Sequence, residues 1–407
     1  MDPEYPIYEW INRELCTKIV NSYVGKSCEI TDLDIKYATR KGDNFTSALF
    51  RIKLTYSETG NAQVQELRFI LKTPIQEEQH IEAVSEEFNI FKRESTVYGT
   101  ILEKCYGLLR EKGDMTVFGP RPLYVEEKLL AMEDLTAMNY NLMGRGKKLN
   151  RHQCHLVLSK LARWHATTAV LFEKEPKLFE NHHVPNFSEE TQHMHLLFTN
   201  ILAAAMKHNR GAPELKNFTN KLAAFTAQVI PRMIGVFTRD PSGFSVLNHG
   251  DLWINNMLFR HSEKENRSDD VLFVDFQEGF YGSPGIDLNY FLYTSVELDI
   301  LLNGYDDLVA FYHEELEKTL KLLGYSGKYP TLQDIHTEII KKGDHGLVTL
   351  LGLVPIMTTP HTQYAEASYF FEDTDETLKA RDLIFNDQQH VSIVAKLLPR
   401  FVENGIL

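Results

Sequence analysis

Cysteine and long apolar segments are scarce in this sequence of 407 residues. The four cysteines form no C-x-x-C pair and are too few for a disulfide framework, which favours a reducing compartment. The most apolar stretch, from Gly346 to Met357, contains Pro355 and is shorter than the roughly 18 residues that a membrane span requires. The first residues contain no basic segment followed by an apolar one, so we expect no secretory signal. Together these features predict a cytoplasmic protein that does not bind a membrane.

Basic residues are also in the minority. The 56 acidic and 43 basic side chains give a formal net charge of −13, which argues against nucleic acid as the main partner because a phosphate backbone attracts a basic surface. A local basic pocket for a nucleotide is still compatible with this charge. Hydrophobic residues at 43% and charged residues at 24% are close to globular averages and exclude a disordered chain. The length predicts two or three domains, or one large fold of two lobes.

The spacing of apolar residues changes near residue 133. Before this point strand-like segments surround one helical segment, whereas most of the later chain has helical spacing. We expect strands within about 30–56, 63–72, 115–118 and 123–132 and a helix over 77–109, then strands at 244–248, 257–260 and 271–277 with a polar hairpin loop at 261–270. The sequence therefore predicts an α+β fold with a small antiparallel sheet lobe at 1–133 and a larger helical lobe at 134–407.

The segment LNHGDLWINNMLF at 247–259 is the strongest chemical motif. It holds His249, Asp251 and Asn256 between two apolar strands, and Asp275 stands at the end of a later strand. Phosphoryl transfer from ATP needs one carboxylate that takes the proton of the attacking hydroxyl, and a second carboxylate and an amide oxygen that hold Mg²⁺. We therefore predict that Asp251, Asn256 and Asp275 are catalytic and that Asn256 and Asp275 bind the metal. A purely structural turn is the alternative, which the apolar flanks disfavour.

Lys72 ends an apolar strand and is predicted to bind ATP phosphates. A lysine at a strand end is usually solvated, but the next helical segment carries Glu94 between large apolar residues. A glutamate in that position can hold the ammonium group over the α- and β-phosphates. Glu86 and Glu87 are rival partners, and Glu94 is preferred because its apolar neighbours place it on the face toward the sheet.

Two further segments of the first lobe are candidate nucleotide contacts. The turn KGDNFTS contains Asp43, Asn44 and Ser47, and its backbone N–H groups could cover phosphates, although an ordinary β-turn explains it equally simply. The strand LLAMEDL stops at an acidic pair, so the backbone between Glu133 and Leu135 can serve as a hinge that binds the adenine edge.

The order of these features resembles the kinase-like fold of small-molecule phosphotransferases, and in particular the ecdysteroid kinase-like family. The resemblance runs from the KGDNFTS turn to the C-terminal helices and is most specific in HGDLWINN and VDFQ. It implies a two-lobed protein-kinase-like fold, ATP and Mg²⁺ as cofactors, and an aspartate, Asp287, that braces the catalytic loop. Gly250 replaces the arginine of protein kinases, and Gln277 replaces the glycine after Asp-Phe. Both departures argue against a protein as the substrate.

The acceptor implied by the resemblance is a small alcohol, with an ecdysteroid as the first candidate. The predicted acceptor wall includes Tyr290, Tyr293 and His361 from the C-terminal helices. A choline-like or xenobiotic alcohol is an alternative, for which Tyr281 and Glu297 could add aromatic and acidic groups. A binding protein that has lost catalysis is the rival from another class. No protein partner is inferred.

Overall fold

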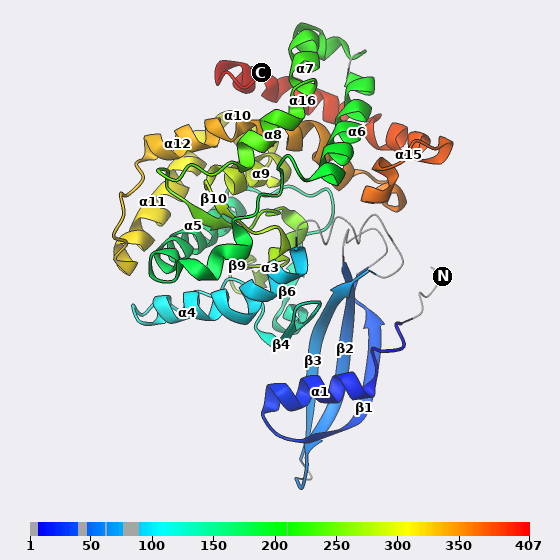
Figure 1. The fold of residues 1–407 in the computed structure, drawn as a ribbon, viewed down its shortest axis with the longest axis vertical. Coiled ribbons are helices and arrows are strands. Elements are labelled where there is room, and N and C mark those ends of the chain that lie inside the picture. Colours follow the sequence, from blue (N-terminus) through cyan, green and yellow to red (C-terminus); the bar gives the residue numbers. More distant parts are fainter. Residues whose placement is uncertain (1–6, 40–46, 62, 76–88, 210) are drawn as a thin grey trace.

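The computed structural model describes residues 7–39, 47–61, 63–75, 89–209 and 211–407. Figure 1 shows a sheet with one helix at one end of the molecule and a larger, mostly helical body at the other. The predicted α+β class with two lobes is thereby confirmed. None of the helices in the described ranges combines the length and apolar character needed to cross a bilayer.

The smaller lobe is built on a five-stranded antiparallel sheet in the order β1-β2-β3-β5-β4. In β2 every second residue from Phe50 to Tyr56 is buried, as expected for a strand with one face on a core. The helix α1 covers that face through Cys16, Ile19 and Val20 (Figure 1). The elements of this lobe are α1 (Arg13–Val24), β1 (Cys28–Tyr37), β2 (Ser47–Glu58), β3 (Val64–Pro74), β4 (Pro122–Glu126) and β5 (Leu129–Glu133).

The larger body contains two small sheets among its helices. One sheet has the order β6-β8-β9 and the other pairs β10 with β7. Its strands are β6 (Tyr140–Leu142), β7 (Val246–Asn248), β8 (Met257–Ser262), β9 (Arg267–Phe273) and β10 (Phe280–Gly282). Its helices are α5 (Arg151–Lys174), α6 (Gln192–Asn209), α7 (Thr219–Thr226), α8 (Val229–Phe237), α9 (Gly285–Ser295), α10 (Leu298–Asn303), α11 (Tyr305–Leu323), α12 (Leu332–Lys341), α13 (Gly343–Val348), α14 (Val354–Thr358), α15 (Asp375–Phe385) and α16 (Gln388–Glu403).

The helical segment between β3 and β4 packs with the larger body. It comprises α3 (Ile90–Thr96), a π-helical turn (Val97–Ile101) and α4 (Leu102–Arg110). Tyr98 and Leu102 of this segment are each 1% exposed and lie in the same core as Trp164 of α5. This segment falls inside the predicted 1–133 lobe, and the lobe boundary stays a prediction. The packing nevertheless ties α3 to the helical body rather than to the sheet.

Some of the expected strands and the expected hairpin loop differ in the structure. The strand at 115–118 is wrong: this segment is irregular, and Met115 and Val117 are exposed, so its alternation has no sheet to pack on. The single run at 123–132 is a hairpin, because the charged pair Glu127-Lys128 turns between β4 and β5. The polar loop at 261–270 is shorter than expected, because β8 extends to Ser262 and β9 begins at Arg267.

Three buried histidines make the stability of the fold sensitive to acid. Burial lowers the pKa of His182 to about 3 and the pKa values of His345 and His390 to about 4, so all three are neutral in the folded protein. A histidine in the unfolded chain has a pKa of about 6.5, so the unfolded state takes up protons first as the pH falls below that value. Each histidine therefore removes about 1.3 kcal/mol of stability between about pH 7.5 and pH 5.5.

We predict that His390→Gln will reduce the pH dependence of the unfolding free energy by about 1.3 kcal/mol over this range. Urea denaturation at the two pH values measures the difference. His261→Gln is the control, because that imidazole is exposed and water solvates it in both states. A pH dependence in His390→Gln equal to that of the unaltered protein would contradict the prediction.

Candidate active site

The loop between β7 and β8 carries Asp251 and is held by a buried carboxylate. Asp287, in the first turn of α9, is fully buried and accepts hydrogen bonds from the backbone N–H groups of His249 at 2.7 Å and Gly250 at 2.8 Å. His165 Nε2 lies 3.0 Å from the same carboxylate. Burial alone would raise the pKa of Asp287, but the bonds from His165 and the loop backbone hold it below its ordinary value. The brace implied for Asp287 is therefore a direct contact with the loop.

Gly250 is the residue that lets the loop turn. Its φ is +86°, in the left-handed region, and a Cβ atom built on it would lie 2.1 Å from the backbone oxygen of Glu278. A side chain at this position would both strain the backbone and collide with the neighbouring segment. The arginine that protein kinases carry here is therefore excluded by the path of the chain.

The Asp251 carboxylate receives one hydrogen bond on each oxygen. Tyr290 donates its O–H to Oδ1 at 2.5 Å, and the Asn256 Nδ2 group donates to Oδ2 at 2.8 Å and to the Asp251 carbonyl at 2.8 Å. Burial raises the pKa of Asp251 to about 8, and the Tyr290 hydrogen bond acts against this rise. The amide of Asn256 is thus oriented by its donor group, which turns its Oδ1 atom away from Asp251.

Asp275 stands where β9 ends and the chain reverses. Its φ of +69° is a left-handed conformation, which is uncommon for a residue other than glycine. Val274 N–H donates to the Asn256 carbonyl at 3.1 Å, so the backbones of the Asn256 and Asp275 segments lie next to each other. The hairpin of β8 and β9 thereby brings the two predicted metal ligands to the same end of the sheet.

Lys72 joins the sheet to these segments. Its ammonium group lies 2.7 Å from Glu94 Oε2 and 2.7 Å from Asp275 Oδ1, and it also donates to Gln277 Oε1 at 3.3 Å. The side chains of Lys72 and Glu94 are each 3% exposed, whereas that of Asp275 is 22% exposed. The pairing with Glu94 is the one that the sequence favoured, while Glu86 and Glu87 lie outside the described residues.

The charges at Lys72 are not balanced. Burial by itself lowers the pKa of the ammonium group, but Asp275 and Glu94 more than offset this and hold it above its ordinary value. Burial raises the pKa of Glu94 to about 7, Lys72 opposes this rise, and Asp275 adds to it. One ammonium group thus contacts two carboxylates, of which Asp275 is the more exposed.

The oxygen donors fit a hard divalent cation. Asp275 supplies a carboxylate and Asn256 an amide oxygen, the ligand types that Mg²⁺ takes in phosphoryl-transfer sites. The excess negative charge beside Lys72 favours the same ion. In the described part of the chain, no cluster of three or more His, Cys, Asp or Glu side chains forms a different metal site.

The other predicted nucleotide contacts lie along the sheet. Ser47 opens β2 and is buried opposite Pro74, two residues after Lys72. Glu133 ends β5 and accepts a hydrogen bond from the backbone of Arg121 at 3.3 Å, while Leu135 is buried in the turn that follows. Asp43 and Asn44 fall outside the described residues. The contacts of these residues with a nucleotide stay predictions.

The three predicted acceptor residues occupy different surroundings. Tyr290 contacts Asp251 directly. Tyr293, one helical turn further along α9, is buried with its ring 4.9 Å from that of Phe401. His361 is half-buried before a 3₁₀ turn, and its backbone N–H donates to the Thr359 hydroxyl at 3.1 Å. Within the described ranges no hydrogen bond joins Tyr293 or His361 to Asp251, so only Tyr290 is brought to the carboxylate.

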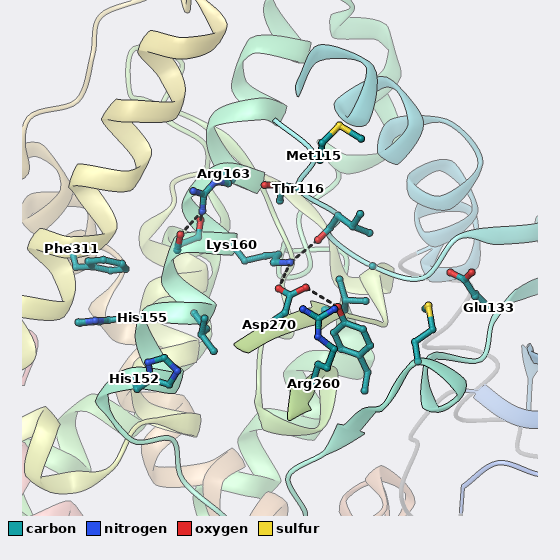
Figure 2. Close-up of a pocket in the computed structure, with 17 residues that line it drawn as sticks. Met115, Thr116, Glu133, His152, His155, Lys160, Arg163, Arg260, Asp270 and Phe311 are labelled. Atoms are coloured by element: carbon teal, nitrogen blue, oxygen red, sulfur yellow. Dashed lines mark hydrogen bonds and ion pairs between the residues drawn. The ribbon is translucent and has the colours of Figure 1, made fainter. Parts of the chain in front are cut away.

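A separate cavity of about 770 Å³ has Glu133 in its lining and does not include the Lys72 or Asp251 side chains. Figure 2 shows Lys160 and Asp270 facing each other in its wall, with the His155 and Phe311 rings stacked at 4.2 Å at one side. Its cations are paired with carboxylates: Lys160 with Asp270 at 2.7 Å, Arg163 with Glu315 at 3.2 Å, and Arg260 with Asp269 at 2.9 Å. These charges are already paired within the protein, and we assign the cavity no ligand.

Sequence reasoning missed several polar partners of the site. Gln277 was seen only as a departure from the kinase pattern, yet its side chain accepts from Lys72. Asn248 was not considered, although its Oδ1 accepts from the Asp287 backbone at 3.2 Å and its Nδ2 donates to Phe280 at 3.1 Å. Arg93, next to Glu94, was likewise not considered. No spacing rule could identify these residues, because their partners come from distant segments.

The chain has a protein-kinase-like fold with two lobes. Its characteristic features are the paired lysine and glutamate, the aspartate after β9 and the Asp251–Asn256 loop. The model of the ecdysteroid kinase-like family matches residues 41–325, and the chain belongs to this family. The resemblance identified from the sequence is thereby confirmed.

Solved structures of two small-molecule kinases are similar at low identity. An ethanolamine kinase of Plasmodium vivax is 13% identical with a TM-score of 0.43, over 95% of this chain and 85% of that chain. An amicoumacin kinase in complex with AMP-PNP and Ca²⁺ is 11% identical with a TM-score of 0.34, over 93% of this chain and 94% of that chain. No curated protein matches significantly. The family assignment therefore depends on the family model and not on these distant likenesses.

We predict that Gly250→Ala will destabilise the protein by about 1–3 kcal/mol more than Gly25→Ala. Both glycines have a positive φ, +86° and +74°, so both variants incur the same kind of backbone strain. A Cβ at Gly25 meets nothing within 4 Å, whereas one at Gly250 collides with Glu278. Urea denaturation of the two variants measures the free-energy cost of the collision as the difference between their losses of stability. Equal losses would contradict the prediction, because the loop would then accommodate the added methyl group without a measurable cost.

Proposed function

We propose that this protein transfers the γ-phosphoryl group of ATP to a hydroxyl of a small alcohol, with Mg²⁺ as the metal. The observation that carries the proposal is the ammonium group of Lys72, which lies 2.7 Å from both Glu94 and Asp275. A lysine so fixed, beside a partly exposed aspartate, suits the phosphates and metal of a bound nucleotide. Membership of the ecdysteroid kinase-like family supports the same class of reaction.

Nucleotide binding falls to residues of the sheet and the hinge. Lys72 would contact the α- and β-phosphates, and Glu94 would keep its ammonium group in place. The turn with Asp43, Asn44 and Ser47 would cover the phosphates through backbone N–H groups. The backbone from Glu133 to Leu135 would bind the adenine edge.

Asn256 and Asp275 would hold Mg²⁺ through their amide and carboxylate oxygens. When bound, the metal neutralises charge on the β- and γ-phosphates. The protein would orient the Asn256 amide oxygen and the Asp275 carboxylate oxygen toward the metal. The hydrogen bonds from Asn256 Nδ2 to Asp251 fix the amide, and the left-handed turn at Asp275 directs its carboxylate.

Asp251 would orient the acceptor hydroxyl and take its proton as the new oxygen–phosphorus bond forms and the bond to the ADP leaving group breaks. The Tyr290 O–H already donates to one oxygen of this carboxylate, so the acceptor would share or replace that bond. Tyr290 would therefore contact both the base and the acceptor. Tyr293 and His361 would lie farther along the acceptor wall.

The family description makes an ecdysteroid the first acceptor to test. Choline-like and xenobiotic alcohols form the second group. Incubation of the protein with MgATP and a panel of these compounds, with mass detection of the phosphorylated product, tests the proposal. Binding of MgATP with no product from any acceptor would instead identify a binding protein that has kept the fold.

Asp251→Asn should lower turnover of the best acceptor by roughly 10²–10⁴-fold, because general-base and orienting groups contribute about that much. The affinity for MgATP should stay close to that of the unaltered protein, since Asp251 faces the acceptor rather than the nucleotide. Product formation and nucleotide binding are measured on the same preparation. A variant that retains more than about half of the original turnover would remove Asp251 from the proposed role.

Asp275→Ala should abolish the gain in ATP affinity that Mg²⁺ provides, because the metal would lose its carboxylate ligand. Calorimetric titration of ATP with and without Mg²⁺ measures that gain. Asp269→Ala is a matched control on the strand just before Asp275, where the carboxylate pairs with Arg260 at the surface. An undiminished Mg²⁺ effect in Asp275→Ala would place the metal elsewhere.

A further inference from the structure

Arg93 is a buried cation directly beside Glu94 on α3. Its side chain is 0% exposed, and burial lowers its pKa to about 10, so it is charged at neutral pH. A buried guanidinium group has to be hydrogen-bonded to offset the loss of water. Its Nη2 group donates to the Val184 carbonyl at 2.8 Å, and its Nη1 group donates to Asn186 Oδ1. The neighbouring His182 is buried and neutral and does not repel it.

Asn186 connects Arg93 to Glu278 through hydrogen bonds. Its Nδ2 group donates to Glu278 Oε2 at 3.0 Å and to the Glu278 carbonyl at 3.1 Å. Glu278 closes the 3₁₀ turn that begins directly after Asp275. The same residue abuts Gly250 of the Asp251 loop. A continuous line of polar contacts therefore runs from α3 to the segments that carry Asp275 and Asp251.

The opposite end of the same helix is also anchored in the larger body. The π-helical turn and α4 continue from α3 and bury Tyr98, Leu102 and Leu109 in the main core. Of the buried side chains on α3, Glu94 reaches Lys72 of the sheet. Two anchors in the helical body thus set the position of Glu94. Arg93 provides the anchor that is nearer the Glu94 carboxylate.

We propose that Arg93, Asn186 and Glu278 form a latch that fixes α3 against the helical body and so holds Glu94 in position to pair with Lys72. The effect of this latch on turnover rests on the proposed function. The three are positioning residues, because they act through Glu94. The latch predicts that the lysine–glutamate pair is kept formed without any bound nucleotide.

Arg93→Met tests the latch with little change in side-chain length. We expect kcat/KM for ATP to fall by about 10–100-fold, since the lost hydrogen bonds involve a buried charge. Hydrogen exchange of the α3 amides should become faster. Lys92→Met is the matched control, because Lys92 is an exposed cation on the same helix. It should change neither measurement.

A double-mutant cycle with Glu94→Gln separates positioning from general damage. If Arg93 acts through Glu94, Arg93→Met should lower kcat/KM for ATP much less in the Glu94→Gln background than in the unaltered protein. Equal effects in both backgrounds would overturn the proposal. Should Arg93→Met fail to fold, Asn186→Ala removes the central contact with a smaller loss. Glu278→Gln, which keeps an oxygen to accept from Asn186, should be milder than Glu278→Leu.

Hydrogen exchange also separates this inference from the proposed function, because it needs no acceptor and no turnover. If no alcohol is phosphorylated, the proposed function fails, and the latch is judged by exchange alone. Faster exchange of α3 in Arg93→Met or Asn186→Ala, but not in Lys92→Met, supports the latch. Unchanged exchange in α3 of the folded variants overturns it.

Discussion

The buried ammonium group of Lys72 is the constraint on which the arrangement of the two lobes depends. An ammonium group that is 3% exposed has lost most of its water, and it is stable there only with carboxylates in contact. No residue of the sheet lobe supplies these among the contacts described. Glu94 comes from a helix packed on the larger body, and Asp275 comes from the end of β9. The Lys72 ammonium group is therefore stabilised only when the sheet is docked against the larger body.

A second buried charge organises the loop that carries Asp251. The Asp287 carboxylate is inaccessible to water and is satisfied by two backbone N–H groups of the loop and by His165. Such bonds need the loop backbone to turn through the left-handed conformation at Gly250. The glycine and the aspartate thus depend on each other, since the turn exposes the N–H groups that the carboxylate accepts. Asp251 inherits its position from this pair.

The parts of the site that the sequence predicted well are those set by neighbouring residues. Glu94 was preferred to its rivals because its apolar flanks mark the buried face of a helix, and the structure places it on Lys72. The apolar runs placed Lys72 and Asp275 at strand ends, whereas β3 continues to Pro74 and β9 stops at Phe273. The prediction of a strand at 115–118 was wrong. A strand-like pattern of apolar residues does not show whether a partner strand lies beside the segment. Arg93 was missed because a buried arginine and a surface arginine look identical in a helical pattern.

The sequence by itself determined the two-lobed class, the family, and the motif of the Asp251 loop with its charged residues. These follow from periodicity, turn chemistry and short motifs, which act over a few residues. Only the tertiary structure decided which charges meet. Lys72 and Asp275 are 203 residues apart, and Arg93 and Asn186 are 93 apart. Tyr290 likewise became the partner of Asp251 only when α9 packed under the loop. The reason is that a buried charge is satisfied by whichever polar group packing brings within reach, and local sequence carries no record of that distance.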